Sequence, residues 1–132
     1  MNTVAVIDYG MGNLRSVAQA VLSAAQHHGA KALITADPDL VRSADRVVLP
    51  GQGAMPDCMR EMDARGLRQA LMAAARSKPF LGICIGLQML FERSEEKTGL
   101  PFDQASFGLT DPSQGRADRS ELVFYTVYIY TV

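Results

Sequence analysis

The sequence lacks a strong excess of charge of either sign, since its 132 residues carry a formal net charge of −1. Nucleic acids and anionic membranes usually bind distinctly basic proteins, so neither partner is expected. Long hydrophobic runs are also missing, because Asp, Arg or Gly interrupts each stretch before it reaches the roughly 18 apolar residues needed to cross a bilayer. These absences favour a globular protein with no membrane or nucleic-acid partner.

A basic leader is absent as well. The chain opens MNTVAVID, whose apolar run is shorter than the core of a signal peptide. We therefore expect a cytoplasmic protein. The length lies within the roughly 100 to 200 residues of one ordinary domain.

Cysteine and histidine are scarce: the sequence has Cys58, Cys84, His27 and His28. Their spacing is not that of a metal site, and no metal or cofactor is expected. The two histidines end a predicted helix, where positive charge is favourable, on the side of the fold away from Cys84. In a reducing compartment both cysteines should be free thiols. Two candidates for thiol chemistry remain.

Alternating strands and helices are what the sequence does contain. Short apolar, often β-branched runs predict buried strands over residues 3–7, 31–35, 46–49 and 79–83. Three- and four-residue apolar spacing, capping residues and composition predict helices from Asn13 to Gly29, from Asp37-Pro38, over 56–76 with a break near Gly66, and over 87–94. The predicted fold class is α/β, a doubly wound, mostly parallel sheet with right-handed crossovers.

The composition changes after about Lys97. Residues 98–120 are rich in Gly, Pro, Asp, Ser and Gln and predict a long loop, whereas residues 122–132 have strand propensity but are apolar on both faces. We therefore expect residues 1–97 to belong to the domain and residues 98–132 to form a divergent tail, which leaves the predicted sheet C-terminally incomplete.

Cys84 lies where a nucleophile is expected, between the strand ending near Ile83 and a helix beginning near Gly86. The reactive form of cysteine is the thiolate, and a helix N-terminus favours negative charge. Strand, turn and helix match the nucleophile elbow of hydrolases, with Cys in place of Ser. The backbone N–H of Ile85 then becomes the natural first donor to an oxyanion.

Alternative roles exist for both cysteines. Cys84 also fits a small buried side chain at a tight turn, because a short G-x-C-x-G motif arises by chance. Cys58 lies among Met55, Met59 and Met62 in a predicted helix and is interpreted as a packing or surface residue.

A second oxyanion donor is expected from Gly51-Gln52-Gly53, which follows the third strand at the same edge of the sheet. Glycines there permit unusual backbone angles and leave room for a substrate. In open α/β sheets the ligand crevice lies beyond the carboxyl ends of the strands, which groups residues 8–13, 51–53 and Cys84. A dinucleotide site is disfavoured, because Gly10-Met11-Gly12 is followed by Arg15 where the fingerprint needs Gly.

Three segments, 7–17 (IDYGMGNLRSV), 49–55 (LPGQGAM) and 82–91 (GICIGLQMLF), resemble the class I, or triad-type, glutamine amidotransferases. Within that family they look most like the glutaminase subunits of imidazole glycerol phosphate synthases of histidine biosynthesis, because the Asn-Leu-Arg run is not shared with other amidotransferases. The resemblance covers roughly residues 1–96.

The resemblance implies that Cys84 attacks the side-chain amide of glutamine, releasing ammonia and forming a glutamyl thioester that water hydrolyses. Gln88 would contact the bound glutamine, and N–H groups of Ile85 and of the loop Gly51, Gln52 and Gly53 would stabilise the oxyanion. The ammonia would pass to a cyclase subunit in a heterodimer, which the loop around residues 13–15 could face.

The chain departs from the family in its histidines. A His-x-Glu arrangement completes the family's triad, but this sequence has no histidine after His28. Impaired glutaminase activity is therefore expected, and a truncated gene or a shifted reading frame beyond about Lys97 is the hypothesis for the tail. Two alternatives remain: a non-catalytic docking or binding module, and a redox or stress-response cysteine protein on the same fold.

Overall fold

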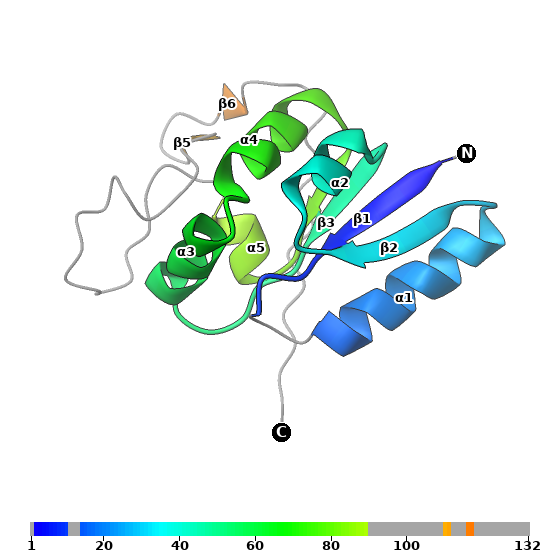
Figure 1. Ribbon diagram of the computed structural model, residues 1–132, viewed down its shortest axis with the longest axis horizontal. Coiled ribbons are helices and arrows are strands. Elements are labelled where there is room, and N and C mark those ends of the chain that lie inside the picture. Colours follow the sequence, from blue (N-terminus) through cyan, green and yellow to red (C-terminus); the bar gives the residue numbers. More distant parts are fainter. Residues whose placement is uncertain (1, 11–13, 90–109, 112–115, 118–132) are drawn as a thin grey trace.

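The computed structural model describes residues 2–10, 14–89, 110–111 and 116–117 (Figure 1). Its centre is a four-stranded parallel sheet, which confirms the predicted α/β class. The strands lie in the order β2-β1-β3-β4. Their bounds are β1 Thr3–Ile7, β2 Lys31–Thr35, β3 Arg46–Leu49 and β4 Phe80–Gly82, so the fourth strand is shorter than predicted.

The helices connect these strands much as the sequence predicts. Gly66, with a φ of +65°, separates α3 from α4 at the predicted break. Asp37 caps α2 by accepting from the backbone N–H of Asp39 at 2.8 Å, and Pro38 follows as the first helical residue. The helices are α1 Leu14–His27, α2 Pro38–Ser43, α3 Met55–Ala64, α4 Arg68–Ser77 and α5 Ile85–Gln88.

Some predictions fall outside the described residues. These are the cap at Asn13, the part of the helix predicted over 87–94 that follows Met89, and the strand-like segment 122–132. Within the predicted long loop, β5 Thr110–Asp111 and β6 Arg116–Ala117 form a short antiparallel pair. Among the described residues no helix is both long and apolar enough to cross a membrane.

Helices cover both faces of the sheet. Side chains alternate along each strand, so a strand can pack against both layers of helices. Figure 1 shows α1 against one face, whereas α2, α3 and α4 lie on the other. Ala5 and Ile7 of β1 pack into the cluster under α2–α4, and Val6 between them packs with Val17 of α1. We call these the α2–α4 face and the α1 face. A strand buried on both sides explains why β1 and β3 read as continuous apolar runs.

The strand order reverses between β1 and β3. The chain leaves β1 for β2 on one side and returns to place β3 on the other. In doubly wound sheets this switch point opens a crevice at the carboxyl ends of the strands, where ligands bind. The segments that follow β1 and β3, residues 8–10 and 50–53, meet here.

Candidate functional site

Cys84 lies in the turn between β4 and α5, so the predicted strand–turn–helix arrangement is present. Its φ is +55°, and it is the one non-glycine residue with positive φ in the described part of the chain. The left-handed conformation costs an L-residue about 1 to 2 kcal/mol. Backbone strain of this kind concentrates at functional sites, where the surrounding structure holds it in place.

The turn is fastened to the end of β3. The backbone N–H of Ile83 donates to the carbonyl oxygen of Leu49 at 2.9 Å, and that of Gly86 donates to the carbonyl oxygen of Ile83 at 3.0 Å. Gly86 itself lies so close to the Leu49 carbonyl that a Cβ added there would overlap its oxygen. Glycine is thus required at 86 by backbone approach.

The residues flanking Cys84 point to opposite faces of the sheet. Ile83 packs against the α1-face cluster, and Ile85 packs against the α2–α4 cluster. Cys84 lies between them and is half-buried, whereas Gln88, one turn later on α5, is exposed. The two isoleucines anchor the elbow on both sides and leave the cysteine at the crevice.

The Gly51-Gln52-Gly53 loop adjoins this elbow, as predicted. A Cβ on Gly51 would lie 2.6 Å from the backbone nitrogen of Gly86 and 2.9 Å from Cβ of Ile85. Gly53 has a φ of +99°, which favours glycine. Gln52 and Gly53 are exposed and Gly51 is buried. The structure therefore brings the predicted oxyanion loop next to Ile85, the residue after the predicted nucleophile.

Two buried side chains lie behind the loop. The Tyr9 hydroxyl donates to the carbonyl oxygen of Pro50 at 2.7 Å, and the Cys58 thiol donates to the carbonyl oxygen of Gln52 at 3.5 Å. Both side chains have no solvent exposure. Burial raises the pKa of Tyr9 far above its ordinary value, and the neighbouring Cys58 raises it further, so the hydroxyl remains a donor.

These contacts change the interpretation of both residues. Cys58 is buried among methionines, as the packing interpretation predicts, but it also holds a loop carbonyl. Tyr9 lies in the segment 8–13 predicted at the crevice, but no role is assigned to it from the sequence. The available signal was its place directly after a buried strand at the predicted crevice, where a polar tip on an aromatic ring needs a partner.

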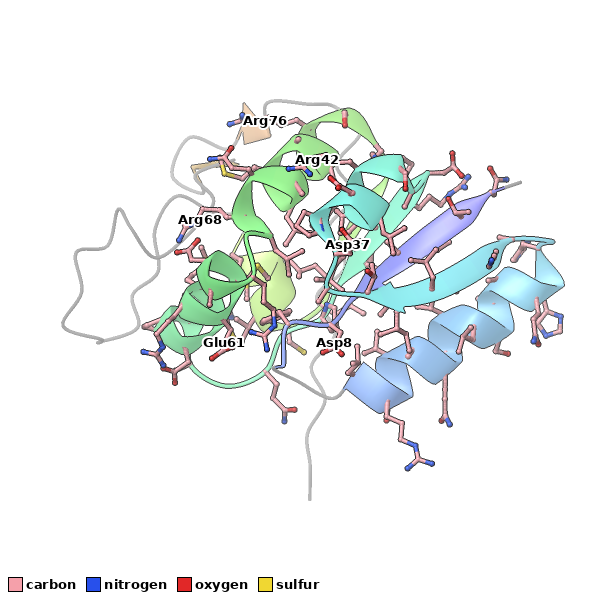
Figure 2. All side chains as sticks on the ribbon, in the orientation of Figure 1. Asp8, Asp37, Arg42, Glu61, Arg68 and Arg76 are labelled. Carbon is pink, nitrogen blue, oxygen red and sulfur yellow. The ribbon has the colours of Figure 1, made fainter. Side chains whose placement is uncertain are left out.

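The first loop of the crevice is described at Asp8, Tyr9 and Gly10 only, so the part of the loop predicted over 11–13 lies outside the described residues. Asp8 accepts from the backbone N–H of Gly10 at 3.1 Å. A Cβ on Gly10 would lie 3.0 Å from Nη2 of Arg65, which also forms an ion pair with Glu61 of α3. Figure 2 shows Asp8 and Glu61 toward the same side of the molecule, with Arg76 of α4 toward the other.

The histidines lie at the amino-terminal edge of the sheet, as predicted. His28 lines a cavity of ≈ 430 Å³ together with Asn2 and Val4 at the start of β1 and Arg46 at the start of β3. Cys84 follows the carboxyl end of β4. Neither histidine is therefore placed to exchange a proton with the thiol. Among the described residues no group of three His, Cys, Asp or Glu side chains can hold a metal ion.

The arrangement suits addition of a thiol to a carbonyl carbon. Ile85 is the first residue of α5, so its N–H has no acceptor within that helix and is available to a developing oxyanion. The glycine loop supplies further N–H groups beside it. The turn and the loop therefore place a thiol and backbone N–H groups where the predicted nucleophile and oxyanion donors are expected, and neither His27 nor His28 lies at this edge.

Comparison with known proteins shows the family of the chain. The family model described as Glutamine amidotransferase class-I matches residues 5–127. Imidazole glycerol phosphate synthase subunit HisH of Dechloromonas aromatica is 67% identical over 94 residues, covering 71% of this chain and 43% of the relative. The subunit of the same name from Aromatoleum aromaticum is 66% identical over 96 residues, covering 73% and 44%.

The chain therefore spans less than half the length of these curated relatives. A solved structure described as glutamine amidotransferase superposes with a TM-score of 0.60 at 17% identity, covering 80% of this chain and 52% of that one. At such low identity the superposition bears on the fold alone.

Proposed function

Because the chain belongs to the class-I glutamine amidotransferase family, we propose that it is a glutaminase of the imidazole glycerol phosphate synthase type, acting in histidine biosynthesis. Its substrate is L-glutamine, its products are glutamate and ammonia, and its partner is a cyclase subunit that consumes the ammonia. A cytoplasmic location belongs to the same proposal. The observation that carries it is the left-handed Cys84 in the turn between β4 and α5, where Gly51 adjoins the two residues that follow Cys84, Ile85 and Gly86.

In the proposed reaction the sulfur of Cys84 adds to the side-chain amide carbon of glutamine. The carbonyl electrons move to oxygen, and the N–H groups of Ile85 and of the Gly51–Gly53 loop stabilise that oxyanion. When the oxyanion collapses, the C–N bond breaks and the nitrogen leaves as ammonia after taking up a proton. Water then attacks the thioester through a second oxyanion, releasing glutamate and the thiol. Gln88, exposed on α5, contacts the bound substrate.

The proton transfers limit the rate in this proposal. Hydrolysis of an amide requires a group that takes the thiol proton and delivers one to the leaving nitrogen. Both histidines of the chain lie at the opposite edge of the sheet. We therefore expect hydrolysis by this chain to be slow, since oxyanion stabilisation and positioning alone retain a fraction of catalysis.

Glutamate released from L-glutamine, with and without the cyclase subunit, tests the proposal. Cys84→Ala should reduce the rate to that of the buffer, because the other cysteine of the chain, Cys58, is completely buried behind the loop. Ser23→Ala, a small exposed change on α1, is the matched control and should keep the wild-type rate. Glutamate release that is unaffected by Cys84→Ala would rule out this nucleophile.

A second candidate is a docking module that binds the cyclase subunit without hydrolysing glutamine. The position of both histidines at the edge away from Cys84 favours it. This function predicts that the wild-type chain binds the cyclase subunit and that the complex releases no glutamate above the Cys84→Ala background. Cys84-dependent release would contradict it.

A further inference from the structure

We propose that Tyr9 and Cys58 are positioning residues that set the direction of the oxyanion loop, keeping the N–H of Gly53 turned away from the core and toward the substrate. The inference rests on the proposed glutaminase function. It assigns a role to two side chains that touch neither glutamine nor the thiol of Cys84 in the proposed mechanism.

Two buried side chains hold two carbonyl groups of the loop. Tyr9 comes from the end of β1 and Cys58 from α3, and they hold the carbonyl oxygens of Pro50 and Gln52 at 2.7 and 3.5 Å. The two acceptors are alternate residues of one loop. Both donors are completely buried, whereas Gln52 and Gly53 are exposed. Two carbonyls of the loop are therefore drawn toward the core.

The geometry of the peptide unit links these carbonyl groups to the N–H groups of the loop. The described residues contain no cis peptide bonds, and in a trans peptide the C=O and the next N–H point in opposite directions. A Gln52 oxygen held by Cys58 on the core side places the Gly53 N–H on the exposed side. By the same geometry, the Pro50 oxygen held by Tyr9 fixes the direction of the Gly51 N–H.

The loop needs these two hydrogen bonds, which we call the loop clamp. Glycine has no Cβ and tolerates both signs of φ, so a loop with Gly51 and Gly53 can rotate its peptide planes at little cost. Rotation of the Gln52–Gly53 plane would turn the carbonyl away from Cys58, leaving a buried thiol without this acceptor and aiming an oxygen at the oxyanion position. Loss of a buried hydrogen bond opposes that rotation.

The position of Gly51 links the clamp to the elbow. Its Cα lies so close to Gly86 and to the Tyr9 hydroxyl that an added Cβ would be 2.6 and 2.8 Å from the backbone nitrogen and the hydroxyl oxygen, respectively. Tyr9 therefore touches the loop at the point where the loop touches the elbow. A shift of either clamp residue would alter the spacing between the loop N–H groups and that of Ile85.

Two conservative deletions test the proposal in the 132-residue chain. Tyr9→Phe removes one hydroxyl and keeps the ring, and Cys58→Ala removes one thiol. Cys58→Ser keeps a donor and should restore part of what Cys58→Ala loses. Thr35→Val is the matched control. Thr35 is the last residue of the neighbouring strand β2, and the change removes a buried hydroxyl that accepts from the backbone N–H of Asp37 at 2.9 Å.

Two readouts separate positioning from a merely structural role. In Cys84-dependent glutamine hydrolysis we expect each deletion to lower kcat about tenfold, a fraction of the loss caused by removing an oxyanion donor entirely. KM should stay within about twofold, because the affected interaction forms mainly in the transition state. In NMR spectra we expect the Gln52 carbonyl and Gly53 amide resonances to shift in Cys58→Ala and to return toward wild type in Cys58→Ser.

The outcomes are distinguishable. Unchanged Gln52 and Gly53 resonances in Cys58→Ala would overturn the proposal whatever the activity, as would an unchanged kcat alongside a lowered melting temperature. A wild-type chain without Cys84-dependent hydrolysis would overturn the glutaminase function, and with it the catalytic purpose of the clamp. In that case the NMR comparison would still decide whether Cys58 orients the loop.

Discussion

The two faces of the sheet differ in how many apolar residues they bury in the described part of the chain. On the α2–α4 face, three helices cover the strands, and the buried cluster extends from Ala5 and Val47 to Tyr9, Met55 and Met89 at the crevice. On the α1 face a single helix lies against β1 and β2, and the buried members of that cluster are Val6, Val17 and Val48 among the described residues.

The difference shows which face supports the site. Ile34 of β2 pairs in register with Val6, yet Ile34 is 48% exposed while Val6 is fully buried. Leu81 and Ile83, also on the α1 face, are partly buried. The loop clamp formed by Tyr9 and Cys58 belongs entirely to the deeper α2–α4 face. The proposed oxyanion loop is thus supported by the larger buried cluster, whereas the other side of the elbow packs against the smaller one among the described residues.

The largest effect is expected at Gly86, because the elbow backbone there carries Ile83 and Ile85, which pack on opposite faces of the sheet. Gly86→Ala would force the elbow off the Leu49 carbonyl and displace Ile83 and Ile85 together, so we expect a loss of about 3 kcal/mol or more in the free energy of unfolding. Urea denaturation followed by circular dichroism measures it.

Gly29→Ala is the control for that change. Gly29 has a φ of +63° and nothing within 4 Å of an added Cβ, so it carries only the left-handed penalty of about 1 to 2 kcal/mol. Equal losses at Gly86 and Gly29 would mean that close approach to β3 is not what requires glycine in the elbow.

A matched pair of valines sharpens the comparison with a smaller effect. Val41 of α2 is fully buried on the α2–α4 face, and Val17 of α1 is 9% exposed on the α1 face. Truncation to Ala removes the same atoms from both. We expect the free energy of unfolding to fall by about 2 kcal/mol in Val41→Ala and by about 1 kcal/mol in Val17→Ala. The loss is larger at Val41 because truncation of a fully buried side chain leaves a larger unfilled cavity.

The valine pair is also measured by urea denaturation. A cost at Val17 equal to or above that at Val41 would show that the α1 face is packed as fully in solution as its opposite. The m-value should stay constant in both variants, since neither changes the surface exposed on unfolding.

The smallest effect concerns Asp45, which belongs to neither face and joins the start of β1 to the start of β3. The backbone N–H and the hydroxyl of Thr3 donate to its carboxylate at 2.7 and 2.9 Å and lower the pKa of Asp45 in the folded state. A lowered folded-state pKa adds stability above the unfolded-state value of about 3.9, and this stability is lost as the pH falls through the folded-state pKa.

Urea denaturation between pH 7 and pH 3 checks the sign for Asp45. Asp45→Asn should be less stable than wild type at pH 7, and the gap should close toward pH 3. Asp39→Asn, at an exposed aspartate that pairs with Arg42, controls for loss of a negative charge. A gap that widens on acidification would contradict the assigned hydrogen bonds.

Much of the fold could be predicted because its signals are local. Each of these signals depends on residues that are close together in sequence. They are the apolar runs of β1 and β3, the helix start at Asp37-Pro38 and the break at Gly66, and all are present in the structure. The approach of the loop to the elbow also followed, since parallel strands bring their carboxyl ends to one edge.

The contacts that orient the site could not be predicted in this way. Tyr9 and Pro50 are 41 residues apart, and their hydrogen bond depends on β1 and β3 being neighbours, which the sequence does not state. The left-handed backbone of Cys84 likewise runs against the propensity of cysteine, which rarely adopts it, and only the resemblance to a nucleophile elbow pointed to a sharp turn there. Tertiary packing imposes both features.

The backbone of Cys84 has one further consequence. Glycine adopts a φ of +55° without strain, whereas cysteine does not. The residue that would make this turn most stable is therefore one without a thiol. Stability and thiol reactivity thus place opposite demands on residue 84, and selection for stability alone would replace the cysteine. A cysteine in this turn therefore lowers the stability of the fold, and the proposed thiol chemistry accounts for its presence there.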